Sequence, residues 1–427
     1  MDKKSIELYE GIEGLFIKND RFNSTVISIH FFIPLDKKTV SKNALLPFLL
    51  SSCTDKYKEY TDLNIRILEL YGAGLSVSVR KNGDNLHLCL SINVINDELT
   101  FNKEGILLEA ADLLCSMVLE PSLCGKSFCE KDVSREVRKN VDRIEGEINN
   151  KRAFARTRLV AEMFGQDPYG LFVYGKTDEV LSITGEELYN EWQSLLDSSY
   201  IKFHVIGNHC PNEIFEQLKE RFSRIARKNV TDISRPALLS ETNNVNIVTE
   251  YFDVSQGKLA LGYTCSENGE EEAALPHLIF SDIFGGGTYS KLFRNVREKE
   301  SLCYYCSASA AFKKGYMIVD SGIDPENADR VIEAVNRELE DIQKGNIDDF
   351  EIESSKKAVY ENLMSSYDNA NALDFWYSKA SNVEKRLSPA DTAQKIKEIT
   401  KEQITRAARC YKLHTIYKLL PERSVEK

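Results

Sequence analysis

Apolar and polar positions along the chain follow a pattern that recurs roughly 230 residues later. An apolar, strand-like run at 27–33 precedes a helix-forming segment at 43–50. A similar run at 259–265 precedes a similar segment at 273–280. Each segment is followed by a small-residue turn and two further strand-like runs. A repeat of this length indicates that one ancestral domain was duplicated.

Two pairs of residues fix the length of the repeat. Pro47 and Pro276 lie 229 positions apart, and Gly83 and Gly315 lie 232 positions apart. The two spacings differ by only a few residues, although the pairs mark different parts of the repeat. The agreement favours two domains of the same fold.

A polar segment separates the two copies. It carries Pro236 and shows no clean period, which is typical of a linker. We therefore expect an N-terminal domain at 1–228, a linker at 229–244 and a C-terminal domain at 245–427. A chain of 427 residues is long enough to give each domain a hydrophobic core of its own.

The order of strands and helices within each half indicates the fold class. The first half begins with strand-like runs at 5–17 and 24–33, and two alternating runs at 75–80 and 85–93 follow. A charged helix or helix pair extends from 131 to about 165. Strands and helices do not alternate regularly, and neighbouring strands are close enough to form hairpins. The pattern predicts an α+β protein with two tandem homologous domains, each a mainly antiparallel sheet packed against helices.

Charge and composition narrow the range of partners. The net charge is −11, from 55 basic and 66 acidic residues, and no basic stripe interleaves with aromatic residues. This argues against nucleic acid and anionic membranes as partners. The N-terminus has no apolar signal core, and no apolar run approaches the length of a membrane span. Ten cysteines, mostly inside expected strands and helices, favour a reducing cytoplasm.

Two cysteine pairs are close in sequence. Cys303 and Cys306 form C-x-x-C within an expected strand, where residues i and i+3 face opposite sides. We therefore expect neither redox nor zinc chemistry from this pair. Cys124 and Cys129 have no Cys or His companions nearby and are expected to be packing residues.

The histidines do not form a recognisable metal motif. No two of the six lie three or four residues apart in a helix, and no H-E-x-x-H or H-x-x-E-H is present. His30, His87, His204 and His414 fall inside apolar strands, where core or edge histidines are expected, and His277 has apolar neighbours. A self-contained zinc site is not predicted.

Phosphate-binding and nucleophile motifs are also missing from the sequence. It contains no G-x-S-x-G, no P-loop and no G-x-G-x-x-G. Gly285, Gly286 and Gly287 form a turn between two expected helices, and positive φ values would explain the three glycines.

An ordered set of motifs nevertheless resembles the pitrilysin/insulinase family of zinc peptidases. In the family's second domain a glycine-rich turn, a helix with Ser-x-Leu-Phe and an Arg-x6-Tyr pair recur in this order. The matching segments here are 284–293 and 296–305. Segments 167–170, 173–175, 183–188 and 204–208 are similar to the family's first domain. The resemblance spans nearly the whole chain and accounts for the duplication.

The same resemblance exposes a departure at the zinc site. The family carries its zinc ligands and general base as H-x-x-E-H on the helix after the second strand. Pro47 and Ser51 stand where the two histidines would be, and Leu50 stands where the glutamate would be. An apolar Leu50 cannot activate a water molecule. The comparison implies that this chain binds no catalytic zinc and has no cofactor of its own.

The family also uses a distal glutamate ligand on the long helix that follows. Glu136, Glu145 and Glu147 are the candidates in this chain. On a charged helix they are expected to be solvated surface residues. One carboxylate without two imidazoles is a poor zinc site.

The second half keeps more of the family's site. Arg297 and Tyr304 match the Arg-x6-Tyr pair, which in the family reaches the substrate beside the zinc. A guanidinium and a phenol both donate hydrogen bonds to a peptide carbonyl that gains negative charge. The alternative is an exposed arginine and a sheet tyrosine without a role, and the resemblance favours function. It also implies that the turn Gly285, Gly286 and Gly287 contacts substrate.

These features imply a division of labour between two chains. Some proteins that resemble this one form heterodimers in which only one subunit carries H-x-x-E-H. We therefore expect a non-catalytic homologue, one half of a clamshell, that pairs with a zinc-bearing H-x-x-E-H paralogue and cleaves peptides only with it. Zinc would be held by the partner, and the peptide would add a strand to the partner's sheet. The alternative is a stand-alone pseudo-peptidase that acts as a peptide-binding or assembly scaffold.

Overall fold

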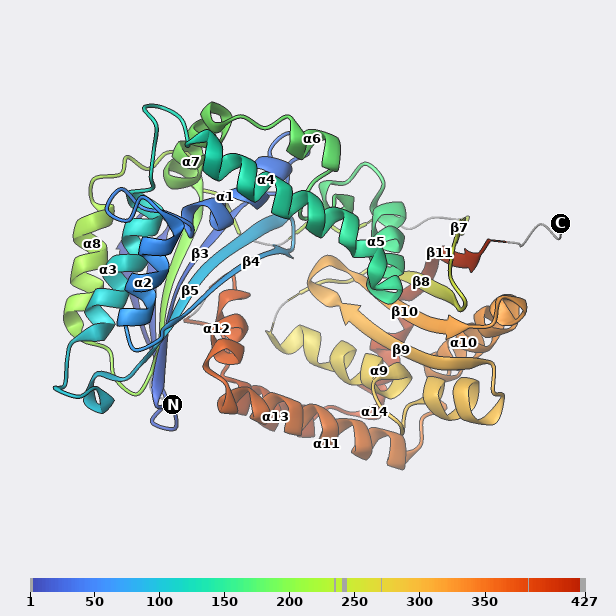
Figure 1. The fold of residues 1–427 in the computed structure, drawn as a ribbon. Coiled ribbons are helices and arrows are strands. Elements are labelled where there is room, and N and C mark those ends of the chain that lie inside the picture. Colours follow the sequence, from blue (N-terminus) through green and yellow to red (C-terminus); the bar gives the residue numbers. More distant parts are fainter. Residues whose placement is uncertain (1–2, 234–235, 240–243, 270, 383, 423–427) are drawn as a thin grey trace. The chain divides into compact units, whose positions relative to one another are not determined.

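A computed structural model describes residues 3–233, 236–239, 244–269, 271–382 and 384–422. The chain divides into two compact units (Figure 1). Unit 1 comprises Met1–Glu145, Leu171–Ser234 and Ser366–Arg386, and unit 2 comprises Gly146–Gly170, Arg235–Ser365 and Leu387–Lys427. Each unit thus includes a segment from the other half of the sequence.

The domain boundaries expected from the sequence are continuous stretches, whereas the units are not. The boundaries 1–228 and 245–427 describe where the two copies of the repeat lie in the sequence, and they stay a prediction. Within the predicted linker 229–244, residues 234–235 and 240–243 lie outside the described residues.

Unit 1 is built on a six-stranded sheet in the order β1-β2-β6-β3-β5-β4. β2 and β6 are parallel, and the other neighbours are antiparallel. The strands are β1 Lys3–Tyr9, β2 Ile12–Lys18, β3 Ser24–Pro34, β4 Gly74–Asn82, β5 Asn85–Ile95 and β6 Tyr200–Gly207. The antiparallel pairing of most strands agrees with the sheet type expected from the sequence.

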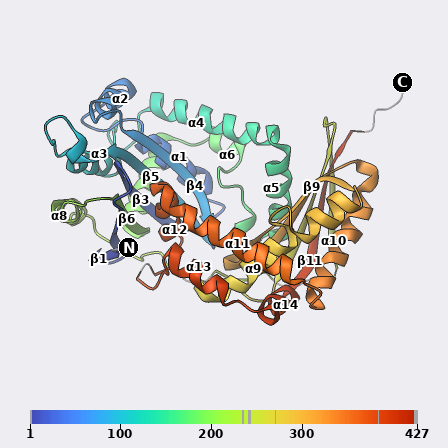
Figure 2. The same cartoon turned by 90° about the horizontal axis from the view of Figure 1, so that it is seen from below.

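Helices pack on the sheet of unit 1 and on one another. Helices α1, α3 and α7 contact its strands, as does α12, which lies along β3 and β6 (Figures 1 and 2). Because side chains alternate along a strand, Val26, Ser28 and His30 of β3 share the face that α12 covers. The helices are α1 Val40–Leu50, α2 Tyr60–Glu69, α3 Ile106–Leu119, α4 Glu130–Glu145, α6 Thr177–Leu181, α7 Gly185–Ser198, α8 Asn212–Phe222 and α12 Ala370–Ser378.

Unit 2 repeats this topology with one strand fewer. Its sheet has the order β7-β11-β8-β10-β9, in which β7 and β11 are parallel and the others antiparallel. This order matches β2-β6-β3-β5-β4 of unit 1 position by position. The predicted duplication and α+β class are therefore confirmed. The strands are β7 Asn246–Phe252, β8 Gly257–Cys265, β9 Cys303–Ala311, β10 Tyr316–Ile323 and β11 Tyr411–Pro421.

Helix α5 packs on the sheet of unit 2 through β8, β10 and β11. Helices α9 and α14 contact other parts of the sheet, and a π-helix, η5, lies against β9. The helices are α5 Lys151–Phe164, α9 Leu275–Gly285, η5 Leu292–Lys299, α10 Ala328–Gln343, α11 Asp349–Ser365, α13 Pro389–Lys397 and α14 Lys401–Arg409. Helices α5 and α12, which both follow a long helix, thus each pack on a sheet formed by the other half of the chain.

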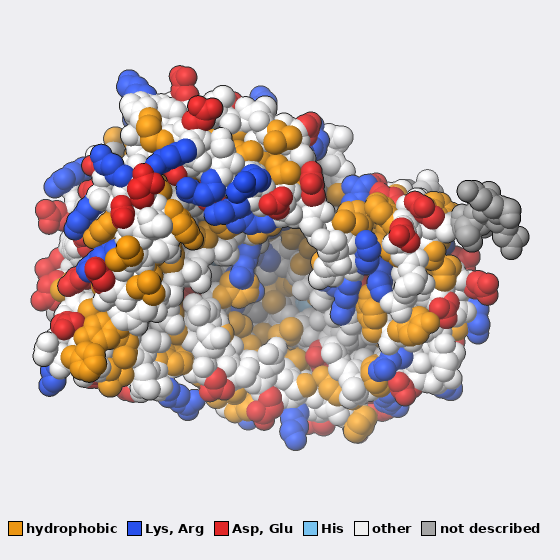
Figure 3. Space-filling model, viewed as in Figure 1, with side chains coloured by type: hydrophobic (Ala, Val, Ile, Leu, Met, Phe, Trp, Pro, Cys, Tyr) orange, Lys and Arg blue, Asp and Glu red, His pale blue; other side chains and the backbone are white. Residues whose placement is uncertain are grey.

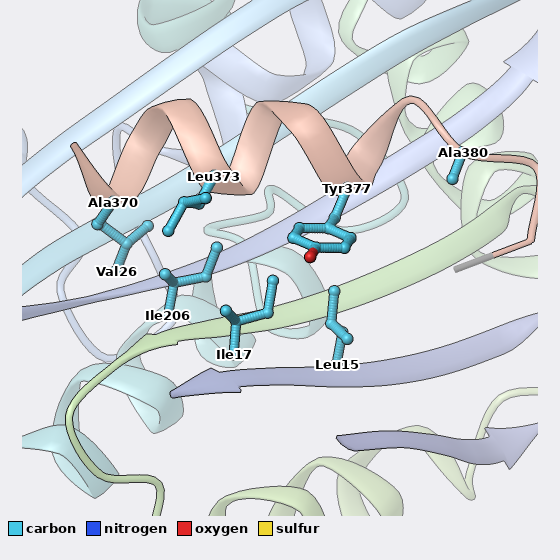
Figure 4. Close-up of a cluster of buried hydrophobic side chains, with 8 residues drawn as sticks. All are labelled: Leu15, Ile17, Val26, Ile206, Ala370, Leu373, Tyr377 and Ala380. Carbon is cyan, nitrogen blue, oxygen red and sulfur yellow. The ribbon is translucent and has the colours of Figure 1, made fainter. Parts of the chain in front are cut away.

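A buried apolar cluster holds α12 on the sheet of unit 1 (Figure 4). Leu373 and Tyr377 of α12 point at side chains from three neighbouring strands. Burial of each such side chain stabilises the fold by roughly 1.5–3 kcal/mol. The cluster consists of Leu15, Ile17, Val26, Ile206, Ala370, Leu373, Tyr377 and Ala380.

Three local features differ from the sequence-based expectations. The run expected as one strand at 5–17 is a hairpin, because Gly11 turns the chain with φ +68° between β1 and β2. The helix expected over 43–50 begins earlier, at Val40, so Pro47 lies in the interior of α1 and cannot donate to the carbonyl of Asn43. Cys124 and Cys129 form a disulfide, so the expectation that they are merely packing residues was wrong.

The surface agrees with a chain of mixed charge. Basic and acidic side chains are interspersed over the face of each unit that Figure 3 draws. Among the described residues, no helix combines the length and the apolar character that crossing a bilayer requires.

Candidate functional site

Helix α1 of unit 1 presents no metal ligands at the positions of the expected zinc motif. Pro47 is buried and Leu50 is fully buried, so both serve as packing residues. The hydroxyl of Ser51 donates to the carbonyl of Phe48 at 3.0 Å and ends the helix. At the three positions of the zinc motif, Pro47 and Leu50 thus belong to the hydrophobic core, and Ser51 caps the end of the helix.

Glu136 on α4 is not the surface charge expected from the sequence. It is only 3% exposed, and its Oε1 accepts from Arg135 Nε at 3.0 Å and from Lys139 Nζ at 2.9 Å. Arg135 and Lys139, two cations of the same helix, therefore neutralise the carboxylate of Glu136, so its charge is balanced without a zinc ion. Glu145 is exposed, as expected.

Arg297 lies on η5 of unit 2. A π-helix is rare in proteins and is frequent at functional sites. The guanidinium stacks 4.5 Å from the centre of the Phe293 ring, forms a 3.6 Å ion pair with Glu298 and is 38% exposed. Ser301, just beyond the helix, has a φ of +52°, a strained value for a residue other than glycine.

Tyr304 lies at a bulge in β9. The pairing with β10 places Tyr305 opposite Gly322 and Cys303 opposite Ile323, so Tyr304 is an extra residue. Its ring is 56% exposed, and its hydroxyl donates to Asp324 at 2.9 Å. This hydrogen bond raises the pKa of Tyr304, so the phenol keeps its proton and stays a donor.

The same bulge overturns the argument about C-x-x-C. An extra residue between Cys303 and Cys306 restores them to the same face, where their thiols interact. A hydrogen bond from Cys306, aided by the charge of Arg297, lowers the pKa of Cys303 to about 7. The expectation that the two face opposite sides was wrong because it assumed an unbroken strand.

The glycine turn is built for close approach and not for positive φ. None of Gly285, Gly286 and Gly287 has a positive φ, contrary to the expectation. A Cβ on Gly285 would lie 2.4 Å from the backbone nitrogen of Ala308 in β9. The following loop is fixed by Tyr289, whose hydroxyl donates to Asp282 at 2.5 Å.

η5 and β9 pack together, so Arg297 and Tyr304 lie on neighbouring elements of unit 2. Arg297 influences Cys303, the residue next to Tyr304, through its charge. The glycine turn ends α9, which also packs on β9. The sequence-predicted residues of the second half thus gather around one strand, whereas Pro47, Leu50 and Ser51 belong to unit 1.

A second cluster of chemically active side chains lies in unit 1, and sequence reasoning missed it as a group. β3 supplies His30, β5 supplies His87 and Cys89, β6 supplies His204, and α12 supplies Asp374. All five are buried. Polar residues at every second position of three apolar strands were a usable signal, since such positions share one face of a sheet.

Hydrogen bonds in this cluster converge on one oxygen. Asp374 Oδ1 accepts from Ser28 Oγ at 2.7 Å, from His204 Nδ1 at 2.8 Å and from His30 Nε2 at 3.0 Å. His30 Nδ1 lies 2.9 Å from His87 Nε2. Three donors around one buried oxygen indicate that Asp374 is ionised, and its negative charge favours a positively charged group beside it.

The pKa values in the cluster follow from these contacts. Burial opposes the charge of His30, but the negative charge of Asp374 raises its pKa to about 10. Burial would raise the pKa of Asp374, but the charge of His30 and the hydrogen bonds from both imidazoles hold it well below its usual range. Burial lowers the pKa of His204 to about 4 and holds that of His87 far below normal. The neutral His204, whose Nδ1 donates to Asp374, is left with Nε2 buried and unpartnered in the described structure.

A cavity of about 250 Å³ opens beside the cluster. Its lining includes His30, His87, Cys89 and Asp374, together with serines of β4 and β5. Arg80 also lines it and stacks 4.5 Å from the centre of the Phe375 ring. The cluster is therefore open to small species from one side although its side chains are buried.

Comparisons with known proteins agree with the fold and with the missing zinc motif. The family model described as "Peptidase M16 inactive domain" matches residues 182–359. The chain is 28% identical over 408 residues to the "Probable inactive metalloprotease YmfF" of Bacillus subtilis, with 95% of each chain covered. It is also similar to a conserved protein from Enterococcus faecalis, with a TM-score of 0.90, 26% identity and full coverage of both chains. A peptidase M16 inactive domain from Pseudomonas fluorescens has the same fold, with a TM-score of 0.79, 16% identity and full coverage of both chains.

These comparisons confirm the resemblance inferred from the sequence motifs. The chain is similar over nearly its whole length to peptidase-like proteins of the pitrilysin/insulinase (M16) type, including relatives described as inactive. Its likeness to inactive relatives agrees with an α1 helix that offers no ligands for a catalytic zinc.

Proposed function

We propose that this chain, an M16-type protein without the zinc motif, is the non-catalytic subunit of a two-chain peptidase. The observation that carries the proposal is an asymmetry between its halves. The helix that would hold zinc has become packing, whereas Arg297 and Tyr304 remain exposed on a π-helix and a bulged strand. A chain that only packed or assembled would have no use for these two donors.

The chemistry of the pair supports a role at a peptide carbonyl. Tyr304 keeps its proton because of Asp324, and Arg297 is always charged. Two such donors stabilise an oxyanion that develops when water attacks a peptide bond. Gly286 and Gly287, which are not buried, would be the part of the turn Gly285, Gly286 and Gly287 that contacts substrate, whereas Gly285 packs against β9.

The remaining parts of the site would come from the partner. We assign zinc and the general base to an H-x-x-E-H paralogue, with the peptide bound as an added strand on that partner's sheet. This chain would bind no catalytic metal of its own. We place the pair in the cytoplasm, since eight cysteines carry free thiols.

The test is a peptidase assay with purified chains, alone and mixed with an H-x-x-E-H paralogue from the same genome. Activity should appear only in the mixture with added zinc. Arg297→Ala and Tyr304→Phe should each lower kcat/KM by about 10²-fold, as expected for loss of an oxyanion donor.

Matched controls come from the same unit. Arg294→Ala removes an arginine of η5 that pairs with Glu351, and Tyr251→Phe alters an exposed tyrosine of β7. Both should leave kcat/KM within about twofold. Equal losses in the controls would refute a specific role for Arg297 and Tyr304.

The second candidate is a stand-alone scaffold that binds peptides or assembles other chains without hydrolysis. The buried, ligand-free α1 helix is compatible with it. A mixture that shows no activity and no complex by gel filtration would favour the scaffold over the heterodimer.

A further inference from the structure

The buried cluster of unit 1 is left without a role by the proposed function. We propose that it is a binding site for one divalent transition-metal ion, with Zn²⁺ the best match, and that His30, Cys89 and Asp374 are its protein ligands. These residues come from β3, β5 and α12. The site is separate from the degenerate motif on α1, and it revises the expectation that the chain binds no metal.

The ligand atoms are already close to a coordination geometry. One atom from each of His30, Cys89 and Asp374 lies within 4.8 Å of the others. Zinc bonds of about 2.0–2.3 Å at tetrahedral angles place ligand atoms roughly 3.5 Å apart. The His30 Nε2 to Asp374 Oδ1 separation is 3.0 Å, so the ion would sit between groups that now touch. His30 and Cys89 are directly paired across β3 and β5, which fixes their spacing.

The cluster also provides the outer hydrogen bonds that metal sites require. A ligating imidazole normally uses its second nitrogen to donate to a neighbour that fixes its orientation. His30 Nδ1 faces His87 Nε2 at 2.9 Å, which leaves Nε2 for the ion. Ser28 and His204 hold the carboxylate of Asp374. The unpartnered Nε2 of the buried His204 adds a lone pair in the same cluster.

Two cations, Lys202 and Arg80, lie near the cluster, and each has other partners. The guanidinium of Arg80 stacks on the ring of Phe375. The ammonium of Lys202, on the same face of the sheet, is held by Glu13 at 3.2 Å and by the carbonyl of Ala380 at 2.5 Å. The cavity of about 250 Å³ reaches His30, Cys89 and Asp374 and gives an ion a route to them. It also has room for a water molecule as the fourth ligand. A mixed set of imidazole, thiolate and carboxylate suits zinc better than the oxygen-seeking Mg²⁺ or Ca²⁺.

The test uses the full chain, stripped with a chelator and titrated with Zn²⁺ and Co²⁺. We expect one zinc per chain by elemental analysis and a rise in the unfolding temperature of several degrees, because the ion binds only the folded form. Co²⁺ should give the near-ultraviolet charge-transfer band of a cobalt–thiolate bond. None of these readouts depends on peptidase activity, so the site can fail while the proposed function stands, and the reverse.

Variants assign the ligands. Cys89→Ala should abolish the cobalt–thiolate band and weaken zinc binding by about 10²-fold or more, whereas His87→Leu should keep the band and weaken binding by about 10–100-fold. Cys115→Ala, a buried cysteine of α3, is the matched control and should leave both unchanged. A stripped wild-type chain that takes up no stoichiometric zinc on titration, or cobalt that binds without the thiolate band, would overturn the site. Since both observations use wild type, a variant that misfolds cannot protect the proposal.

Discussion

The two units share one strand order, but they anchor the helix contributed by the other half of the chain in opposite ways. In unit 1 the buried anion, Asp374, lies on helix α12, and the sheet supplies His30 and His204. In unit 2 the anion, Asp320, lies on the sheet, and helix α5 supplies Arg152 and Arg156. A helix is thus held on a sheet in both units, but the positions of the anion and its partners are reversed.

The two charge arrangements differ in whether their side chains can lose protons. Guanidinium groups stay protonated and do not coordinate metals, so the unit 2 network has only one state. Imidazoles and a thiol can give up protons to a metal, so the unit 1 network has two. The unit 2 arginines are also 49% and 32% exposed, whereas Asp374 and its imidazole partners are almost completely enclosed. The two units share a fold, and among the described residues a group of possible metal ligands is found in unit 1 alone.

Removal of the anion from unit 1 should have the largest effect. Asp374→Ala leaves His30, His204 and Ser28 without their shared acceptor in a buried site. We expect a loss of about 3–5 kcal/mol in the free energy of unfolding, measured with metal removed. Tryptophan fluorescence during urea unfolding reports this unit, because Trp192 and Trp376, the only two tryptophans of the chain, both lie in it. A loss below about 1 kcal/mol would mean that the network does not anchor α12.

Helices α1 and α9 hold the same place in the two units and offer a second contrast. Helix α1 ends on the buried Leu50, whereas α9 ends on Gly285 because the backbone of β9 approaches closely. Gly285→Ala should destabilise unit 2 by about 1–3 kcal/mol, the cost of overpacking, as measured by hydrogen exchange of β9. Gly105→Ala, where a new methyl group meets nothing within 4 Å, is the control and should be nearly neutral. Equal effects at both glycines would disprove the close-approach argument.

Removal of the anion from unit 2 should cost less. Asp320→Ala leaves two arginines that can turn to solvent, so we expect a loss of about 1–2 kcal/mol. Hydrogen exchange of β10 would report the change, and the tryptophan transition of unit 1 should not move. A loss as large as that of Asp374→Ala would remove the distinction between the two networks.

Much of the fold could be predicted from the sequence. The spacing of Pro47 and Pro276 indicated the duplication, and alternating apolar positions located most strands. The order of motifs indicated the resemblance to M16 metallopeptidases, and the occupants of the zinc positions, Leu50 among them, indicated that α1 lacks the residues of the zinc motif. These inferences rest on short-range pattern and on order along the chain, which the sequence displays directly.

What could not be predicted depends on pairing between distant segments. Asp374 lies 344 residues from His30, and no local pattern indicates that α12 returns to the first sheet. Glu136 looked like a surface charge because its helix is polar on most sides, and only packing of α4 buries it. The bulge at Tyr304 adds one residue to the pleat and reverses the facing of every later side chain.

The thiols give the finest contrast between the units. A hydrogen bond from Cys306 lowers the pKa of Cys303 to about 7, whereas burial raises that of Cys115 in unit 1 to about 12. The thiolate is the reactive form, so alkylation of Cys303 by iodoacetamide should rise as the pH passes upward through about 7, while Cys115 stays unmodified. Peptide mapping by mass spectrometry between pH 5.5 and 8.5, a range of about three units around that pKa, would follow both residues.

Cys306→Ser replaces the thiol donor with a hydroxyl and should keep the low pKa of Cys303. Cys306→Ala should move the alkylation curve of Cys303 upward by about one pH unit or more, toward an unperturbed thiol. An unchanged curve in Cys306→Ala would mean that the bulge does not bring the two thiols together.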